Sequence, residues 1–115
     1  MGMLQNLIDA HKFKTFLESE VDTKVMITEF VQLTNEQNRR FYVYLRIKPS
    51  QYLEYRRKVD IGDEIDPNQY EILEYGWGEP TAAQRAVMAE KYNVDHEFEN
   101  KLREKLMKKK LEQAS

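Results

Sequence analysis

Two adjacent segments of the chain carry opposite charge. The types of side chain in these segments determine which kinds of partner the protein could recognise. Residues 39–58 contain seven basic side chains and one acid, whereas residues 60–79 contain seven acids and no base. The basic segment also contains five aromatic residues, Phe41, Tyr42, Tyr44, Tyr52 and Tyr55. Guanidinium groups neutralise phosphates, and exposed aromatic rings stack on unpaired bases. This pattern indicates either recognition of a charged partner or packing of the two segments against each other.

The basic segment predicts a nucleic-acid surface if its aromatic rings are exposed. Side chains alternate along residues 41–48, so a strand there would bury the odd positions and expose an aromatic and basic even face. The candidate nucleic-acid-binding residues are Tyr42, Tyr44, Arg46, Lys48, Arg56 and Arg57. In the alternative, the tyrosines pack under a helix and the bases meet the acidic segment. The sequence pI of about 5.7 favours this alternative, because dedicated nucleic-acid binders are usually basic overall.

The acidic segment fits a calcium-binding loop poorly. Aligned with that template, the potential ligands are Asp60, Glu64, Asp66, Asn68 and Glu71. Gly62 occupies the third position and supplies no ligand, and Ile65 occupies the sixth position, where the turn requires glycine. We therefore predict no metal site here, and we interpret the segment as a solvated loop or as an acidic surface for a basic partner.

The only tryptophan lies between two glycines, in Gly76-Trp77-Gly78. This spacing indicates a tight backbone path with a fixed ring, and it lacks the lysine and Ser/Thr of a phosphate-binding loop. A tryptophan of this kind fills a core, anchors a protein interface or binds a ligand. The candidate partner-binding residues are Trp77, Tyr75 and Glu79.

No residue pattern supports catalysis. The chain has no cysteine and only two histidines. We expect His11 to be a partly buried structural residue, and His96 with Glu99 cannot complete a metal site alone. The sequence therefore predicts no catalytic residue, no metal ligand and no cofactor.

Hydrophobic periodicity predicts the elements that position these residues. We expect helices over about 3–20, 51–59, 81–92 and 96–112, and strands over 24–33, 41–48 and 70–75. Residues 34–38 form a hairpin connector, and residues 60–69 form a loop. Glu29 interrupts the apolar face of the first strand, so a bulge is possible there. A third strand is the rival prediction for 51–59.

Turn and capping residues predict where these elements end. We expect Asp22 to end the first helix, Pro49 to end the second strand, and Ser50 to cap the helix that follows. Gly76-Trp77-Gly78 ends the third strand. The other expected caps are a Thr81–Gln84 capping box, Asn93 after the third helix and Asp95 before the last helix.

The predicted architecture is a single α+β domain over residues 1–115, in the order α-β-β-α-β-α-α. A hairpin and one short strand would form a small antiparallel sheet, with helices on one face. Residues 105–115 could be a frayed basic tail, or could bind an acidic partner, a second copy or a membrane surface. No apolar run is long enough to span a membrane and no signal peptide is recognisable, so we expect a cytoplasmic protein without membrane contact.

The function expected from these features is a non-enzymatic protein-interaction or adaptor module. Its partner is an unidentified protein or a second copy of the chain. The alternative is a module that binds single-stranded RNA or DNA. A metal-dependent enzyme is a remote third hypothesis.

Overall fold

The computed structural model describes the backbone of residues 11–114 and the side chains of residues 11–109. The predicted helix over 3–20 therefore lies partly outside the described residues; within them, residues 11–16 are helical and continue into a π-helical turn, η1 (Leu17–Val21). The elements that follow are β1 (Ile27–Thr34), β2 (Arg40–Ile47), α2 (Pro49–Ile61), η2 (Pro67–Gln69), β3 (Glu71–Trp77), α3 (Ala82–Lys91) and α4 (His96–Ala114). The predicted α+β class and element order are confirmed.

The three strands form one antiparallel sheet in the order β1-β2-β3, so β1 and β3 are its edges. The register of β1 against β2 is continuous, from Ile27 opposite Ile47 to Thr34 opposite Arg40. The bulge that was possible at Glu29 is therefore not formed. The irregularity lies between β2 and β3, where the register shifts at Tyr44 and Leu45.

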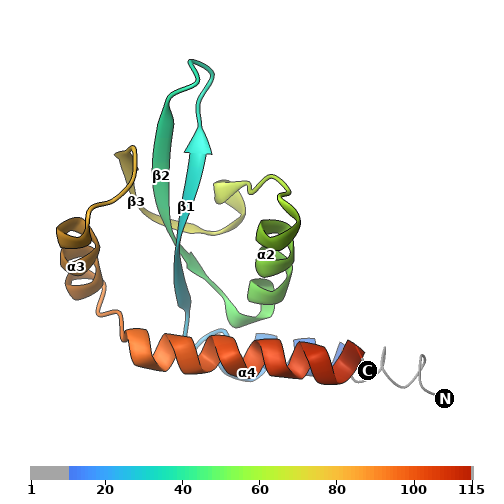
Figure 1. Cartoon of the computed structure of the whole chain (residues 1–115). Coiled ribbons are helices and arrows are strands. Elements are labelled where there is room, and N and C mark those ends of the chain that lie inside the picture. The colour runs from blue at the N-terminus through green and yellow to red at the C-terminus, as the bar shows by residue number, and fades with distance from the viewer. Residues whose placement is uncertain (1–10, 115) are drawn as a thin grey trace.

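Helices cover both faces of the sheet, so the prediction of helices on one face was wrong (Figure 1). The odd-numbered side chains of β2 pack with Tyr52 and Tyr55 of α2. The even-numbered Tyr42 and Tyr44 pack with Met88 of α3. Because both faces of β2 carry apolar or aromatic side chains, each face needs its own cover. Figure 1 also shows α4 crossing below the end of the sheet that lies opposite the hairpin turn.

The segment after β2 is a helix, as predicted, and the rival strand is excluded. Lys48, and not Ser50, is the N-cap residue of α2, and Pro49 occupies the first turn. Proline is favoured there because the first helical N–H groups need no intrahelical acceptor. Ser50 binds Asp22 instead, whose carboxylate accepts from the Ser50 backbone N–H at 3.0 Å. Asp22 ends η1, as expected.

The remaining boundaries follow the predicted caps. Thr81 and Gln84 form the capping box of α3, Asn93 adopts a φ of 54°, and Asp95 accepts a hydrogen bond from the Phe98 N–H. However, β3 extends through Trp77, so the Gly76-Trp77 pair lies within the strand and does not end it. The last helix continues to Ala114, and Leu106, within the predicted basic tail, is 2% exposed.

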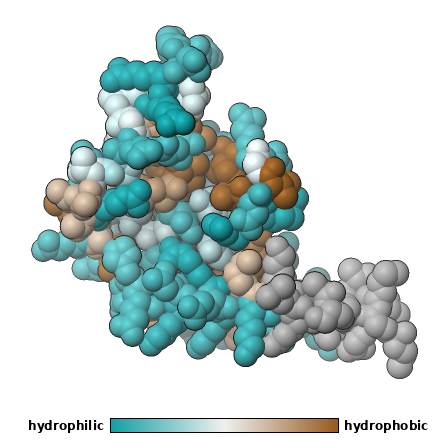
Figure 2. Space-filling view, in the orientation of Figure 1, coloured by the Kyte–Doolittle hydropathy of each residue, from teal (hydrophilic) through white to brown (hydrophobic). Residues whose placement is uncertain are grey.

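Hydropathy is distributed unevenly over the surface. Figure 2 shows hydrophobic residues gathered between the sheet and the end of α2, whereas hydrophilic residues cover α4. Val59 and Ile61, at the end of α2, are 39% and 63% exposed. Among the described residues, no helix combines the length and the apolar character needed to cross a membrane.

Candidate functional site

The two tyrosines of the predicted nucleic-acid surface are buried. Tyr42 and Tyr44 are 6% and 2% exposed, and the Tyr44 ring stacks on Phe30 with 4.3 Å between ring centroids. Met88 of α3 packs on both tyrosines. The expectation of an exposed aromatic and basic face on β2 was therefore wrong, because α3 folds back over it. Rings in these positions cannot stack on bases unless α3 moves away.

The basic residues of this candidate set do not share one surface. Arg46 lies on the α3 side of the sheet, with Glu71 at 3.7 Å, whereas Arg56 lies on α2, with Asp60 at 3.0 Å. Lys48 and Arg57 are exposed. Both ion pairs join the basic segment (residues 39–58) to the acidic segment (residues 60–79). This pairing was predicted from the sequence as the alternative to nucleic-acid binding.

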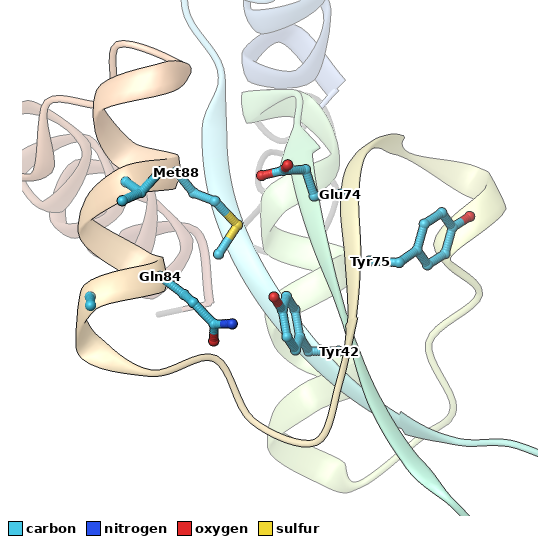
Figure 3. Close-up of a pocket in the computed structure, with 7 residues that line it drawn as sticks. Tyr42, Glu74, Tyr75, Gln84 and Met88 are labelled. Atoms are coloured by element: carbon cyan, nitrogen blue, oxygen red, sulfur yellow. The ribbon is translucent and has the colours of Figure 1, made fainter.

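The two aromatic residues predicted to bind a partner are exposed together. Tyr75 and Trp77 are 64% and 56% exposed, and they lie two residues apart on the same face of β3. Figure 3 shows the Tyr75 ring pointing away from α3, to the opposite side of the sheet. The Arg39 guanidinium lies 3.8 Å from the centre of the Trp77 ring, and the Phe41 ring meets it edge-on at 6.3 Å. Glu79, the third predicted residue, is exposed just beyond the strand.

These side chains line an aromatic groove of about 410 Å³, formed by Asn35, Phe41, Tyr75, Gly76 and Trp77. Phe41 also lines a second hollow of about 490 Å³, which contains Ile65 and the acidic residues Glu64 and Asp66. The two hollows therefore share Phe41 as a lining residue. We call them together the aromatic groove and its acidic extension.

The backbone of β3 beside this groove is open. The Gly78 N–H donates to the Arg40 carbonyl at 2.9 Å, so the even-numbered residues of β3 face β2. The N–H and C=O groups of Tyr75 and Trp77 consequently point away from β2. Because β3 is a sheet edge and no other strand of the described residues flanks it, these groups can accept an added strand.

A second pocket lies on the other face of β3, between the strand and α3 (Figure 3). Its volume is about 360 Å³, and Tyr42, Glu74, Gln84, Val87 and Met88 line it. Figure 3 shows the Tyr42, Gln84 and Met88 side chains directed into the space between α3 and the sheet. The open edge of β3 therefore has a pocket on each face.

At the opposite edge of the sheet, α4 binds the outer backbone groups of Thr28, near the start of β1. Glu99, 5% exposed, accepts hydrogen bonds from the Thr28 N–H at 3.0 Å and from the Thr28 hydroxyl at 2.8 Å. Arg103 donates to the Thr28 carbonyl at 2.6 Å, to Glu99 and to Glu29. Sequence reasoning missed this network. Its signals were the Glu99–Arg103 spacing of four residues on one helix and the acid that interrupts the apolar face of β1.

Burial raises the pKa of the Glu29 carboxyl above its ordinary value of 4.5, and the neighbouring Arg103 opposes this shift. A carboxyl with a raised folded-state pKa costs stability as pH rises above 4.5, because the unfolded chain then loses its proton more readily. We expect Glu29→Gln to remove this loss. The melting temperature of the variant minus that of the wild type should increase from pH 4.5 to neutral pH; a constant difference would contradict the assignment.

The histidines do not form a metal centre within the described residues. His11 is exposed, so the prediction of a partly buried residue was wrong, and His96 is also exposed. Among residues 11–109, no group of three or more His, Cys, Asp or Glu side chains is arranged to hold a metal ion.

No protein-family model matches the chain, and comparisons with curated proteins and with solved structures found no match.

Proposed function

We propose that this protein is a protein-interaction module that binds an extended segment of a partner protein along the open edge of β3. The observation that supports the proposal is the exposure of Tyr75 and Trp77, side by side, where the outer backbone groups of the strand are also free. An added strand gains affinity from main-chain hydrogen bonds and specificity from pockets for its alternate side chains.

The open edge of β3 offers both free main-chain groups and pockets for side chains. A strand paired with Tyr75 and Trp77 would direct alternate side chains to opposite faces of the sheet. Those on one face would enter the aromatic groove, and those on the other face would enter the pocket beneath α3. A segment with an apolar residue facing the aromatic groove near its centre therefore fits the edge best.

Trp77 is the expected energetic centre of this interface. Tryptophan and tyrosine are enriched among the residues that dominate binding, and truncating such a residue costs about 2 kcal/mol or more. This cost corresponds to a loss of affinity of roughly thirtyfold. Arg39 stabilises the orientation of the Trp77 ring before a partner arrives, which lowers the entropic cost of binding.

A foreign partner fits the edge better than a second copy of the chain. Antiparallel pairing of two β3 strands about Tyr75 would bring Glu71 of each copy near Glu79 of the other, which follows the end of the strand. Like charges brought together in this way are destabilising. We therefore expect a monomer at the concentrations used for binding experiments.

The test is selection of a phage-displayed library of random linear peptides on the wild-type protein, with prior depletion on Trp77→Ala. We expect enriched peptides that bind the wild type and lose about thirtyfold or more in affinity for Trp77→Ala. Phe98→Ala is the matched control, because Phe98 is a similarly exposed aromatic residue on α4, and it should bind these peptides normally.

Two results would overturn the proposal. The first is failure to enrich any peptide that requires Trp77, when Trp77→Ala retains the wild-type circular dichroism spectrum. The second is concentration-dependent dimerisation, by analytical ultracentrifugation, that Trp77→Ala abolishes, because the edge would then serve a second copy.

The other functions expected from the sequence have less support. Nucleic-acid binding stays an untested prediction. Because Tyr42 and Tyr44 are buried, stacking of their rings on bases no longer supports it. Metal-dependent catalysis and a cytoplasmic location also stay predictions without a direct observation.

A further inference from the structure

From the charges around the aromatic groove, we infer that the partner segment is basic and carries Lys or Arg beside the apolar residue that contacts Trp77. This inference rests on the proposed function and specifies the partner of the same surface. Its basis is the distribution of acidic side chains that form no ion pair within the described residues.

Three of the seven acids in residues 60–79 are in ion pairs. These are Asp60 with Arg56, Glu71 with Arg46, and Glu74 with Lys91. The remaining four acids, Asp63, Glu64, Asp66 and Glu79, are all exposed. Within residues 11–109, no Lys, Arg or His side chain forms an ion pair with any of them. The internal pairing of the two charged segments is thus incomplete.

The unpaired acids lie at both ends of the aromatic surface. Glu64 and Asp66 line the acidic extension, which shares Phe41 with the aromatic groove. Glu79 lies two residues beyond Trp77 on the same chain segment. The bound strand would run along the outer side of β3, so a Lys or Arg side chain on its groove face would extend across Trp77 and Phe41 to reach Glu64 and Asp66.

Two bases lie near the same surface and reduce its negative charge. The Arg39 guanidinium stacks on Trp77, and Arg40 is exposed at the start of β2. The three unpaired acids beside this surface, Glu64, Asp66 and Glu79, outnumber these two bases, so the surroundings of the groove carry net negative charge. Charge complementarity of this kind selects partners and speeds their association more than it adds affinity.

The acidic loop is ordered by hydrogen bonds within the loop itself. The Asp63 carboxylate accepts from the Glu64 N–H at 2.8 Å, and the Asp66 carboxylate accepts from the Asn68 N–H at 3.0 Å. These bonds fix the backbone of the loop, and Ile65 anchors it in the core at 7% exposure. The Glu64 side chain is left at the surface beside Phe41.

The test uses the Trp77-dependent peptides from the library selection, so that failure of the inference can be distinguished from failure of the proposed function. We expect Lys and Arg to be over-represented in these peptides relative to the unselected library, next to an apolar residue. Peptides that require Trp77 but are neutral or acidic would overturn the inference while leaving the proposed function intact. Absence of any Trp77-dependent peptide would overturn both.

Charge reversal near the groove tests the same inference on the protein. In the double variant Glu64→Lys/Glu79→Lys, we expect the Kd of a basic selected peptide to rise about fivefold or more at low salt. The matched control is Glu90→Lys/Glu104→Lys, which makes the same change in net charge at exposed positions on α3 and α4. Equal weakening by the two double variants, or no weakening by either, would contradict the inference.

Discussion

Gly76→Ala is expected to destabilise the fold by about 1–3 kcal/mol, although alanine is normally better tolerated than glycine within a strand. A Cβ atom at this position would overlap the phenol ring of Tyr42, which lies opposite Gly76 on β2. The ring cannot move freely, because it meets Phe30 edge-on at 5.9 Å and packs with Met88. Urea denaturation monitored by circular dichroism measures the cost.

Making the same substitution in a variant that lacks the Tyr42 ring separates this steric effect from other causes of destabilisation. In Tyr42→Val, no phenol ring is present at the overlap, so adding Gly76→Ala should be neutral or stabilising by up to about 1 kcal/mol. A wild-type-background Gly76→Ala variant that is as stable as the parent would show that the ring does not lie over Gly76.

Glu99→Ala is expected to have the largest effect on stability, a loss of about 3–5 kcal/mol. The substitution leaves the Thr28 N–H and hydroxyl without their acceptor at a buried position, and it removes one anionic partner of Arg103. Arg103 keeps Glu29 as an anionic partner, so the cost arises mainly from the two buried Thr28 donors, at about 1–3 kcal/mol each, and the total stability of a small domain is only about 5–15 kcal/mol. Thermal denaturation should therefore show a much lower melting temperature.

Glu97→Ala is the matched control on the same helix. Glu97 pairs with Lys101 at 3.2 Å, with side chains 80% and 68% exposed, and an exposed pair contributes about 0–1 kcal/mol. If Glu99→Ala costs no more than this control, the hydrogen bonds between α4 and β1 do not hold the helix in place.

The helices and strands were predicted well because the residue patterns that specify them lie within the elements themselves. The alternation of residues 41–48 predicted β2 and the burial of Val43, Leu45 and Ile47. The Thr81–Gln84 capping box predicted the start of α3 from two side chains alone. Such features depend on neighbours a few residues away, which a sequence displays directly.

The covering of Tyr42 and Tyr44 could not be predicted in the same way. Tyrosine is compatible with both exposed and buried positions, and only Met88 of α3 is fully buried against the sheet. One buried residue produces no apolar stripe from which the docking of α3 could be inferred. Nothing in the sequence therefore marks the even face of β2 as a second core.

The exposure of Trp77 also depends on how an element far away in the sequence packs on the sheet. Its position between two glycines was compatible with a core, an interface or a ligand site. The core alternative is excluded because α2 covers the sheet over Val43 and Leu45 and leaves Tyr75 and Trp77 accessible at the edge. The hydrogen bonds of Glu99 to Thr28 join residues 71 positions apart, a separation at which sequence spacing has no predictive value.

Amide hydrogen exchange at β3 tests the central claim most directly. The measurement compares the free protein with the protein saturated by a Trp77-dependent peptide. Strand addition predicts slower exchange of the Tyr75 and Trp77 amides, which face outward, and little change at Glu74 and Gly76, which face β2. Unchanged exchange at Tyr75 and Trp77 in the saturated complex would contradict the claim that the partner binds as an added strand.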